Sequence, residues 1–98
     1  MTLEIKRNVN EIMIKVVGRL DTFTSPVLGK TIDRNVPEGK SIVLDLSGLE
    51  AISESGVQIL LDANKKMQPT GSLRLMGVSE GVMDTLKANG CADILMKS

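Results

Sequence analysis

The sequence predicts a single α/β domain over residues 1–98, with a mixed, mostly parallel β-sheet, an N-terminal hairpin and three helices. Short apolar stretches with the spacing of strands recur along the chain, and segments with helical apolar spacing separate the later ones. Strand–helix–strand units place their strands parallel, whereas two strands joined by a short turn pair antiparallel. A chain of 98 residues is long enough to bury one modest core.

The first two strands are predicted from alternation. Leu3 and Ile5 alternate with charged residues, and residues 12–16 resume the same period after the turn-forming residues 8–10. This pattern is typical of a half-buried hairpin. We expect residues 18–24 to connect the hairpin to the first helix.

The first helix is predicted to begin at Ser25, with Pro26 in its first position. A serine side chain accepts hydrogen bonds from the free amides of a first turn, and proline fits there because it has no amide hydrogen. Residues 35–40, which include Pro37 and Gly39, are expected to end the helix. Its core-facing side chains are expected to be Val27, Leu28 and Ile32.

A nearly continuous apolar segment at residues 42–46 is typical of a central strand covered on both faces. We expect residues 47–52 to form a short loop after it. A second helix is predicted to follow from Ser53 and to stop at residues 68–71, which contain Pro and Gly. Its apolar residues at helical spacing are Val57, Leu60, Leu61 and Met67.

The last third of the chain predicts a fourth strand over residues 73–76 and a third helix capped by Ser79. Asn89 and Gly90 are expected to end this helix in a left-handed conformation. Residues 94–96 are expected to form a short edge strand. The buried stripe of the third helix is predicted to be Val82, Met83 and Leu86.

Composition excludes several classes of protein. Twelve basic and twelve acidic residues give no net charge, which disfavours a nucleic-acid binder. The chain has no histidine and one cysteine, Cys91, so it lacks the residues of Ser-His-Asp catalysis and of the usual zinc sites. No apolar run approaches the roughly 20 residues of a membrane span. We expect a cytoplasmic protein that is not an enzyme and binds no cofactor, metal, nucleic acid or membrane.

The segment where the second helix begins is the best candidate for a functional site. Ser53 is the natural N-cap, which places Glu54 and Ser55 in the first turn, and Gly56 allows another group to approach closely. The free amides and the helix dipole favour a phosphate on a serine at this place. The alternative is that Ser53 and Ser55 are only capping residues.

Residues 44–61, LDLSGLEAISESGVQILL, resemble the signature of STAS domains, and more narrowly of the small bacterial anti-sigma factor antagonists. That signature is a central strand ending in Asp-Leu-Ser, followed by a loop and a Ser-Gly pair that opens a helix. Residues 17–21, VGRLD, and residues 75–90 also resemble the family. The resemblance covers nearly the whole chain.

The resemblance implies a partner switch. Ser55 matches the phosphoacceptor, Ser53 matches a position that is often Asp, and Asp21 matches an acidic residue near the phosphorylation site. The unphosphorylated antagonist of this family binds an anti-sigma factor that is also a serine kinase, and phosphorylation ends the interaction. A serine phosphatase restores it, and ATP and magnesium belong to the kinase. The exposed face of the second helix around Gln58 would complete the contact surface.

The chain departs from the family at Glu54, where many members have Ser. This carboxylate could select the kinase through charge complementarity, could partly mimic phosphorylation, or could simply suit the helix dipole. Other functions remain open: a phosphorylation-independent scaffold or transporter accessory subunit, a nucleotide sensor, or a hydrolase using Ser55. Asp45 is expected to bind loop amides. Asp21 and Asp45 could also suggest a metal site, but the spacing indicates no third ligand.

Overall fold

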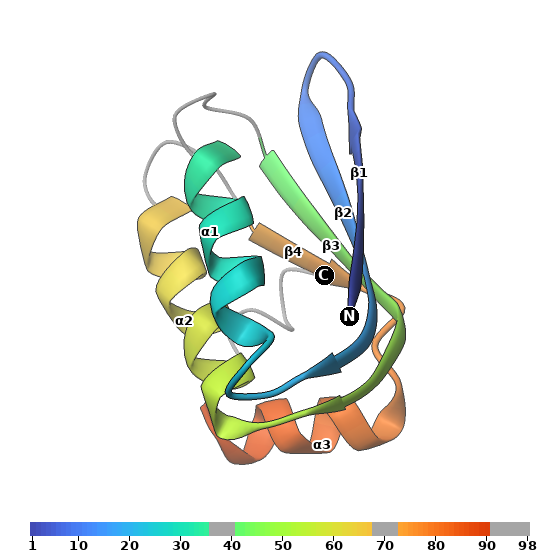
Figure 1. The fold of residues 1–98 in the computed structure, drawn as a ribbon, viewed down its shortest axis with the longest axis vertical. Helices are drawn as coiled ribbons and strands as arrows, with labels where there is room; N and C mark the ends of the chain where they lie inside the picture. Colours follow the sequence, from blue (N-terminus) through green and yellow to red (C-terminus); the bar gives the residue numbers. More distant parts are fainter. Residues whose placement is uncertain (36–40, 68–72, 91–98) are drawn as a thin grey trace.

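A four-stranded sheet with three helices forms the structure, which is a computed structural model that describes residues 1–35, 41–67 and 73–90 (Figure 1). The elements, in chain order, are β1 (Thr2–Arg7), β2 (Glu11–Leu20), α1 (Ser25–Asn35), β3 (Ser41–Ile52), α2 (Glu54–Met67), β4 (Leu73–Met76) and α3 (Glu80–Ala88). The strand order is β1-β2-β3-β4; β1 pairs antiparallel with β2, and the other pairs are parallel. The predicted mixed, mostly parallel sheet with its hairpin is therefore confirmed.

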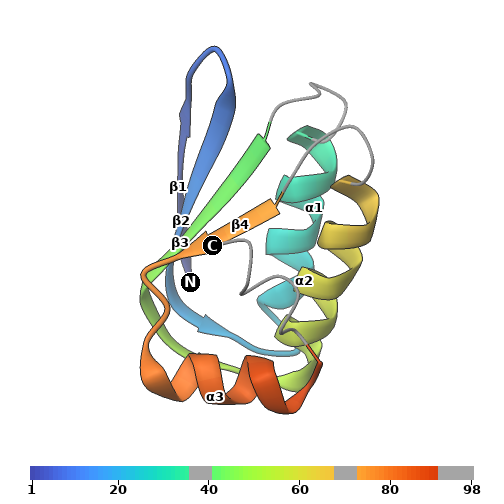
Figure 2. The same ribbon diagram turned by 180° about the vertical axis from the view of Figure 1, so that it is seen from behind.

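The core lies between the sheet and the helices. Helices α1 and α2 run side by side along the sheet, and α3 lies across the end toward which β2 and β3 extend (Figures 1 and 2). Alternate residues of β2 point into this core, as their spacing predicts. The largest fully buried side chains come from every strand but β1 and from two helices: Ile12, Ile14, Leu20, Leu28, Ile32, Ile42, Leu44, Leu46, Leu60, Met67, Leu73 and Leu75.

The N-terminal hairpin turns where the sequence predicts. The Asn8 side chain accepts hydrogen bonds from the amides of Asn10 (2.9 Å) and Glu11 (2.7 Å), which closes the turn. The expected burial of β1 is only partly correct: Leu3 is half-buried, but Ile5 is 41% exposed. The reason is that β1 is the edge strand and lies beyond the part of the sheet that α1 and α2 cover (Figure 1).

Strands β2 and β3 are longer than predicted. The expected connection at residues 18–24 begins only after Leu20, and the expected loop at residues 47–52 is the second half of β3. Their pairing shifts register twice, between Lys15 and Val17 and between Gly18 and Arg19, and each shift accommodates one extra residue on β3. Such bulges strengthen the twist of a strand and bend it. This bending carries both strands across α3, and the residues expected to form a loop continue β3 through its two bulges.

Helix α1 begins at Ser25, as predicted, but Ser25 is not its N-cap. Ser25 is 1% exposed, and its hydroxyl has no hydrogen-bond partner among the described residues, so it does not cap the helix. The Thr24 carbonyl instead accepts hydrogen bonds from the amides of Val27 (3.0 Å) and Leu28 (3.4 Å). Val27 was expected in the core but is 51% exposed, because the neighbouring Leu28 and Ile32 occupy the side that faces the sheet.

Helices α2 and α3 follow their predicted stripes. The four predicted apolar residues of α2 are buried or half-buried, and so are the three of α3. Ser79 occupies the N-cap position of α3, but its side chain forms no capping hydrogen bond. Gly90 has a φ of 81°, as expected for a left-handed stop. Cys91, the stop at residues 68–71 and the strand expected at residues 94–96 lie outside the described residues.

Candidate functional site

The turn between β2 and α1 is held rigidly by two side chains. The Asp21 carboxylate accepts hydrogen bonds from the amides of Phe23 and Thr24, both at 2.9 Å. The Thr24 hydroxyl accepts a hydrogen bond from the Asp21 amide at 2.9 Å, so the two residues cap one another. The amide hydrogen bonds from Thr24 and Phe23 hold the pKa of the Asp21 carboxyl below its ordinary value. Asp21 is therefore a structural residue that shapes the turn.

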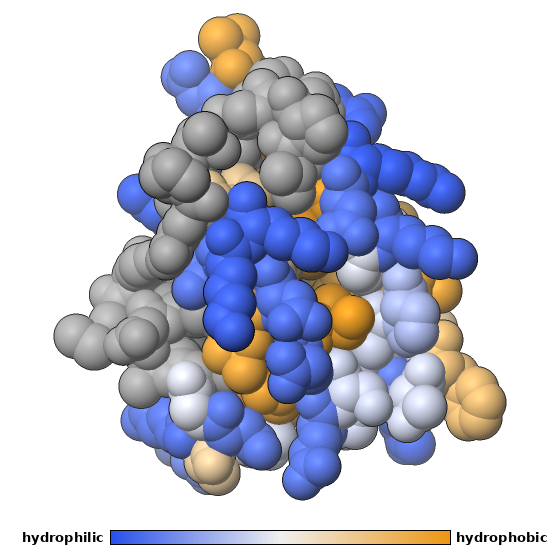
Figure 3. Space-filling model, turned by 90° about the vertical axis from the view of Figure 1, so that its left-hand side faces the viewer, coloured by the Kyte–Doolittle hydropathy of each residue, from blue (hydrophilic) through white to orange (hydrophobic). Residues whose placement is uncertain are grey.

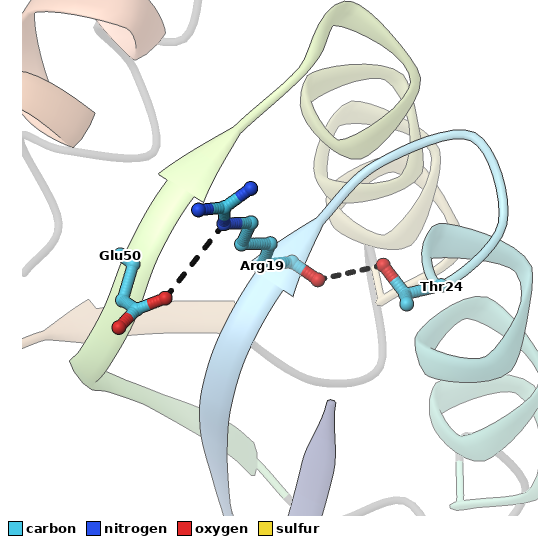
Figure 4. A network of polar contacts seen from close by, with 3 residues as sticks. All are labelled: Arg19, Thr24 and Glu50. Carbon is cyan, nitrogen blue, oxygen red and sulfur yellow. Dashed lines mark hydrogen bonds and ion pairs between the residues drawn. The ribbon is translucent and has the colours of Figure 1, made fainter.

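The same turn is tied back to β2 and, through β2, to β3. The Thr24 hydroxyl donates a hydrogen bond to the Arg19 carbonyl at 2.7 Å, and the Arg19 side chain lies 3.7 Å from the Glu50 carboxylate (Figure 4). Both charged side chains are 71% exposed, so water screens this ion pair.

The start of α2 is joined to the end of β2. The Ser53 amide donates a hydrogen bond to the Leu20 carbonyl at 2.8 Å. The Ser53 hydroxyl accepts one from the Gly56 amide at 3.4 Å, and the Ser53 carbonyl accepts one from the Val57 amide at 3.0 Å. The prediction that Ser53 is the N-cap of this helix is confirmed.

Gly56 is required by the packing of this junction. A Cβ atom at this position would lie 2.8 Å from Cγ1 of Ile52 and 2.9 Å from Cβ of Leu20. Both distances are shorter than a carbon–carbon contact allows. We predicted that a glycine here lets another group approach, and that group is the end of β2 in the same chain.

These two junctions bring Ser55 next to the β2–α1 turn. The Ser55 hydroxyl lies 3.4 Å from the hydroxyl of Thr22, and Ser55 is half-buried in the first turn of α2. Glu54 is exposed beside it, and Gln58, also exposed, follows one turn later and donates a hydrogen bond to Asp62 at 3.0 Å. The residues predicted for the site thus gather at one end of the molecule, where α1 and α2 begin.

Thr22 and Phe23 lie beside the predicted residues but were not predicted as site residues. Thr22 is the residue of the turn that reaches Ser55, and Phe23 is 86% exposed. A large apolar side chain this exposed is available for contact with another protein. The sequence feature that could have indicated Phe23 is that the only aromatic residue of the chain lies in a predicted connection.

We expected Asp45 at the end of a strand, but it lies within β3, at its first bulge. Its carboxylate accepts a hydrogen bond from the Ser47 amide at 2.9 Å, as predicted, and this bond lowers the pKa of the Asp45 carboxyl. Asp21 and Asp45 each bind amides of their own segment. Within residues 1–35, 41–67 and 73–90, no group of three or more acidic, histidine or cysteine side chains is arranged to hold a metal ion.

The outer side of α1 and α2 continues from the site. Hydrophilic side chains cover most of this side, with apolar side chains showing between them (Figure 3). The two helices pack closely, because a Cβ atom on Gly29 would lie only 3.1 Å from the Ile59 side chain. An ion pair between Lys66 and Asp33 at 2.7 Å also joins them. In the described part of the chain, no helix combines the length and the apolar character needed to cross a membrane.

Comparison with known proteins identifies the family. The family model described as the STAS domain matches residues 1–97. The anti-sigma-B factor antagonist of Bacillus subtilis is 23% identical over 96 residues, covering 97% of this chain and 88% of the relative. A solved anti-sigma factor antagonist from Mycobacterium paratuberculosis superposes with a TM-score of 0.85 at 20% identity, covering 94% of this chain and 80% of the other. The phosphorylated form of the Bacillus cell fate determinant SpoIIAA superposes with a TM-score of 0.75 at 16% identity, covering 95% and 87%. This chain belongs to the STAS domain family.

Proposed function

We propose that this protein is an anti-sigma factor antagonist whose complex with an anti-sigma factor is controlled by phosphorylation of Ser55. The anti-sigma factor is the serine kinase and supplies the site for ATP and magnesium. Its capture by this chain frees a sigma factor for transcription, and a serine phosphatase reverses the modification. The observation that carries this proposal is the Ser55 hydroxyl in the first turn of α2, beside a rigid turn that presents the exposed Phe23.

The position of Ser55 suits a phosphoacceptor. Its hydroxyl is near the surface, and the described neighbour within hydrogen-bond distance is another hydroxyl, that of Thr22. A phosphate adds about −1.5 to −2 charges at pH 7. The first turn of a helix favours this charge through its free amides and its dipole, so the modified domain keeps its fold.

The same phosphate opposes docking because it lies at the centre of the contact surface. That surface consists of Thr22, Phe23, Glu54, Ser55 and Gln58, all at the end where α1 and α2 begin. A partner that packs on Phe23 removes water from the neighbouring Ser55. A phosphate on Ser55 either keeps its bound water, which prevents close packing, or is buried as a desolvated charge, and both weaken the complex. A loss of about 2.7 kcal/mol of binding free energy makes the complex about 100-fold weaker.

The relatives support the proposal in two respects. One relative carries the name anti-sigma-B factor antagonist, and SpoIIAA has been solved in both an unphosphorylated and a phosphorylated form. Three interpretations of Glu54 are to be distinguished: kinase selection, partial mimicry of a phosphate, and a residue that only suits the helix dipole and leaves kinase binding unchanged when replaced. The variant Glu54→Ser distinguishes them, because loss of a selecting charge weakens kinase binding, whereas loss of a mimic strengthens it.

The experiment uses wild-type protein, Ser55→Ala and Ser55→Asp as baits in a lysate of the source cells. Ser79→Asp, the same substitution at the exposed start of α3, is the matched control. We expect wild type, Ser55→Ala and the control to retain an ATPase that Ser55→Asp releases. The purified ATPase with magnesium ATP should phosphorylate wild type at Ser55, located by peptide mass spectrometry, and should leave Ser55→Ala unmodified. Equal retention of one partner by all baits, without phosphorylation, contradicts the switch and favours a scaffold.

A further inference from the structure

We infer that two copies of this chain associate through the outer edges of their β1 strands, in an antiparallel pair centred on Ile5. This inference is independent of the proposed function. It joins the two four-stranded sheets into one continuous sheet across a two-fold axis.

The outer edge of β1 pairs with no further strand among the described residues. β1 is the first strand of the sheet formed by the described residues and pairs there with β2. Five of its six residues are exposed, and the sixth, Leu3, is half-buried. The edge of a strand presents a row of backbone N–H and C=O groups that another strand can pair with. Six residues is an ordinary length for a paired strand.

The charges of β1 select one register for pairing with itself. In a strand, the backbone N–H and C=O groups of alternate residues point to the same edge, and alternate side chains point to the same face. Two copies related by a two-fold axis can therefore pair only in a register that places even-numbered residues opposite even-numbered residues. Centred on Ile5, the pair places Glu4 of each copy opposite Lys6 of the other, which makes two opposite-charge pairs. A pair centred on Glu4 or on Lys6 instead places two like charges on the axis. The sequence of β1 is thus complementary to itself in a single register.

The neighbouring side chains agree with this register. Within the chain, Glu4 is opposite Lys15 of β2, whereas Lys6 is opposite Met13 and so faces no acid there. In the pair of copies, Lys6 gains the Glu4 carboxylate of the second copy on its outer side. Ile5 lies on the other face, opposite Ile14 of β2, and is 41% exposed in the single chain. On the two-fold axis it contacts its own counterpart, which removes apolar surface from water.

The interface does not compete with the site around Ser55. β1 forms the far border of the sheet, and α1 and α2 begin on the other side of the molecule (Figure 1). Each dimer therefore leaves two sites accessible. Because the two ion pairs are exposed, the association weakens as salt is added.

Charge reversal in separate and mixed variants tests the register. Glu4→Lys places Lys opposite Lys6, and Lys6→Glu places Glu opposite Glu4, so each variant by itself should dimerise about tenfold more weakly than wild type. Mixed in equal amounts, the two variants form a heterodimer in which both pairs have opposite charges. The double variant Glu4→Lys/Lys6→Glu also restores both pairs. Sedimentation velocity at low salt over a concentration series measures all of these species against the 10.5 kDa monomer.

The matched controls are Asp84→Lys on α3 and Lys30→Glu on α1, which change the net charge equally at exposed positions away from β1. They should dimerise like wild type, and thermal unfolding verifies that every variant is folded. A wild type that stays monomeric up to millimolar concentration overturns the inference. So does a mixture of the two single variants that associates no better than either variant alone.

Discussion

Helices α2 and α3 each follow an N-cap serine, begin with glutamate and have a glycine in the first turn, yet the two starts carry different constraints. At α2, the amide, carbonyl and hydroxyl of Ser53 all form hydrogen bonds, and Gly56 packs against the end of β2. At α3, the side chain of Ser79 forms no capping bond, and a Cβ atom on Gly81 would meet nothing within 4 Å. The same local pattern is therefore a packed junction in one place and an exposed helix end in the other.

The difference favours the start of α2 over the start of α3 as the place of the proposed site. A binding surface needs side chains held in one geometry, because a mobile surface loses conformational entropy on binding. The start of α2 is held by β2 and by the Asp21–Thr24 turn, which also fixes Thr22 and Phe23. The start of α3 has the serine and the helix dipole but no such support for its capping side chain.

The largest expected contrast concerns the two glycines. Gly56→Ala forces its new methyl group into Leu20 and Ile52 and should lower the free energy of unfolding by about 1–3 kcal/mol. Gly81→Ala has open space and a helical backbone, so it should raise the free energy of unfolding by about 0.5–1 kcal/mol. Urea unfolding followed by circular dichroism measures both. Equal effects of the two substitutions would show that packing at the start of α2 is not special.

A smaller contrast is expected for the two capping serines. Ser53→Ala removes a capping bond that is long, at 3.4 Å, and should cost about 0.5–1 kcal/mol of the free energy of unfolding. Ser79→Ala removes no bond and should change the free energy of unfolding by less than about 0.5 kcal/mol. The same urea titration gives both values. A larger loss for Ser79→Ala would contradict the assignment of the two caps.

The smallest expected effect is a pH dependence confined to the turn beside α2. Hydrogen bonds lower the pKa of Asp21 in the folded state, so its contribution to stability is present above the ordinary carboxyl value of 3.8. That contribution is lost as the pH falls through the lower, folded-state pKa. Asp21→Asn keeps an acceptor oxygen but cannot be protonated in this range. Its unfolding temperature should therefore fall less than that of wild type between about pH 5 and about pH 3, and an equal fall would disprove this role of Asp21.

Much of the fold was predictable because its apolar periodicities are strong. The side of an element that faces the core carries apolar residues at regular intervals, and these intervals can be read from a single sequence. They are clear as alternation in β2 and β4 and as helical spacing in α2 and α3. The parallel arrangement followed from the order of the elements. The prediction was wrong for residues 47–52, because a bulged strand and a loop share polar and glycine residues.

The candidate site also has a part that the sequence predicted and a part that it did not. Ser53 as a cap and Ser55 in the first turn were predicted, because capping depends on residues that are close in sequence. The contact between Thr22 and Ser55 joins residues 33 positions apart and depends on the parallel pairing of β2 and β3. Nothing in the local pattern indicates which residue of the turn reaches across.

The amino-acid sequence contains the fold class, the order of the elements, the family resemblance and the serine at the start of α2, because each is a matter of periodicity or of nearby residues. The folded chain adds what depends on distant neighbours: the reason that Gly56 must be glycine, the exposure of Phe23, the structural role of Asp21 and the outer edge of β1, which pairs with no further strand among the described residues. Burial and contact are properties of the assembled sheet and helices, so they exist only once strands remote in the sequence have paired.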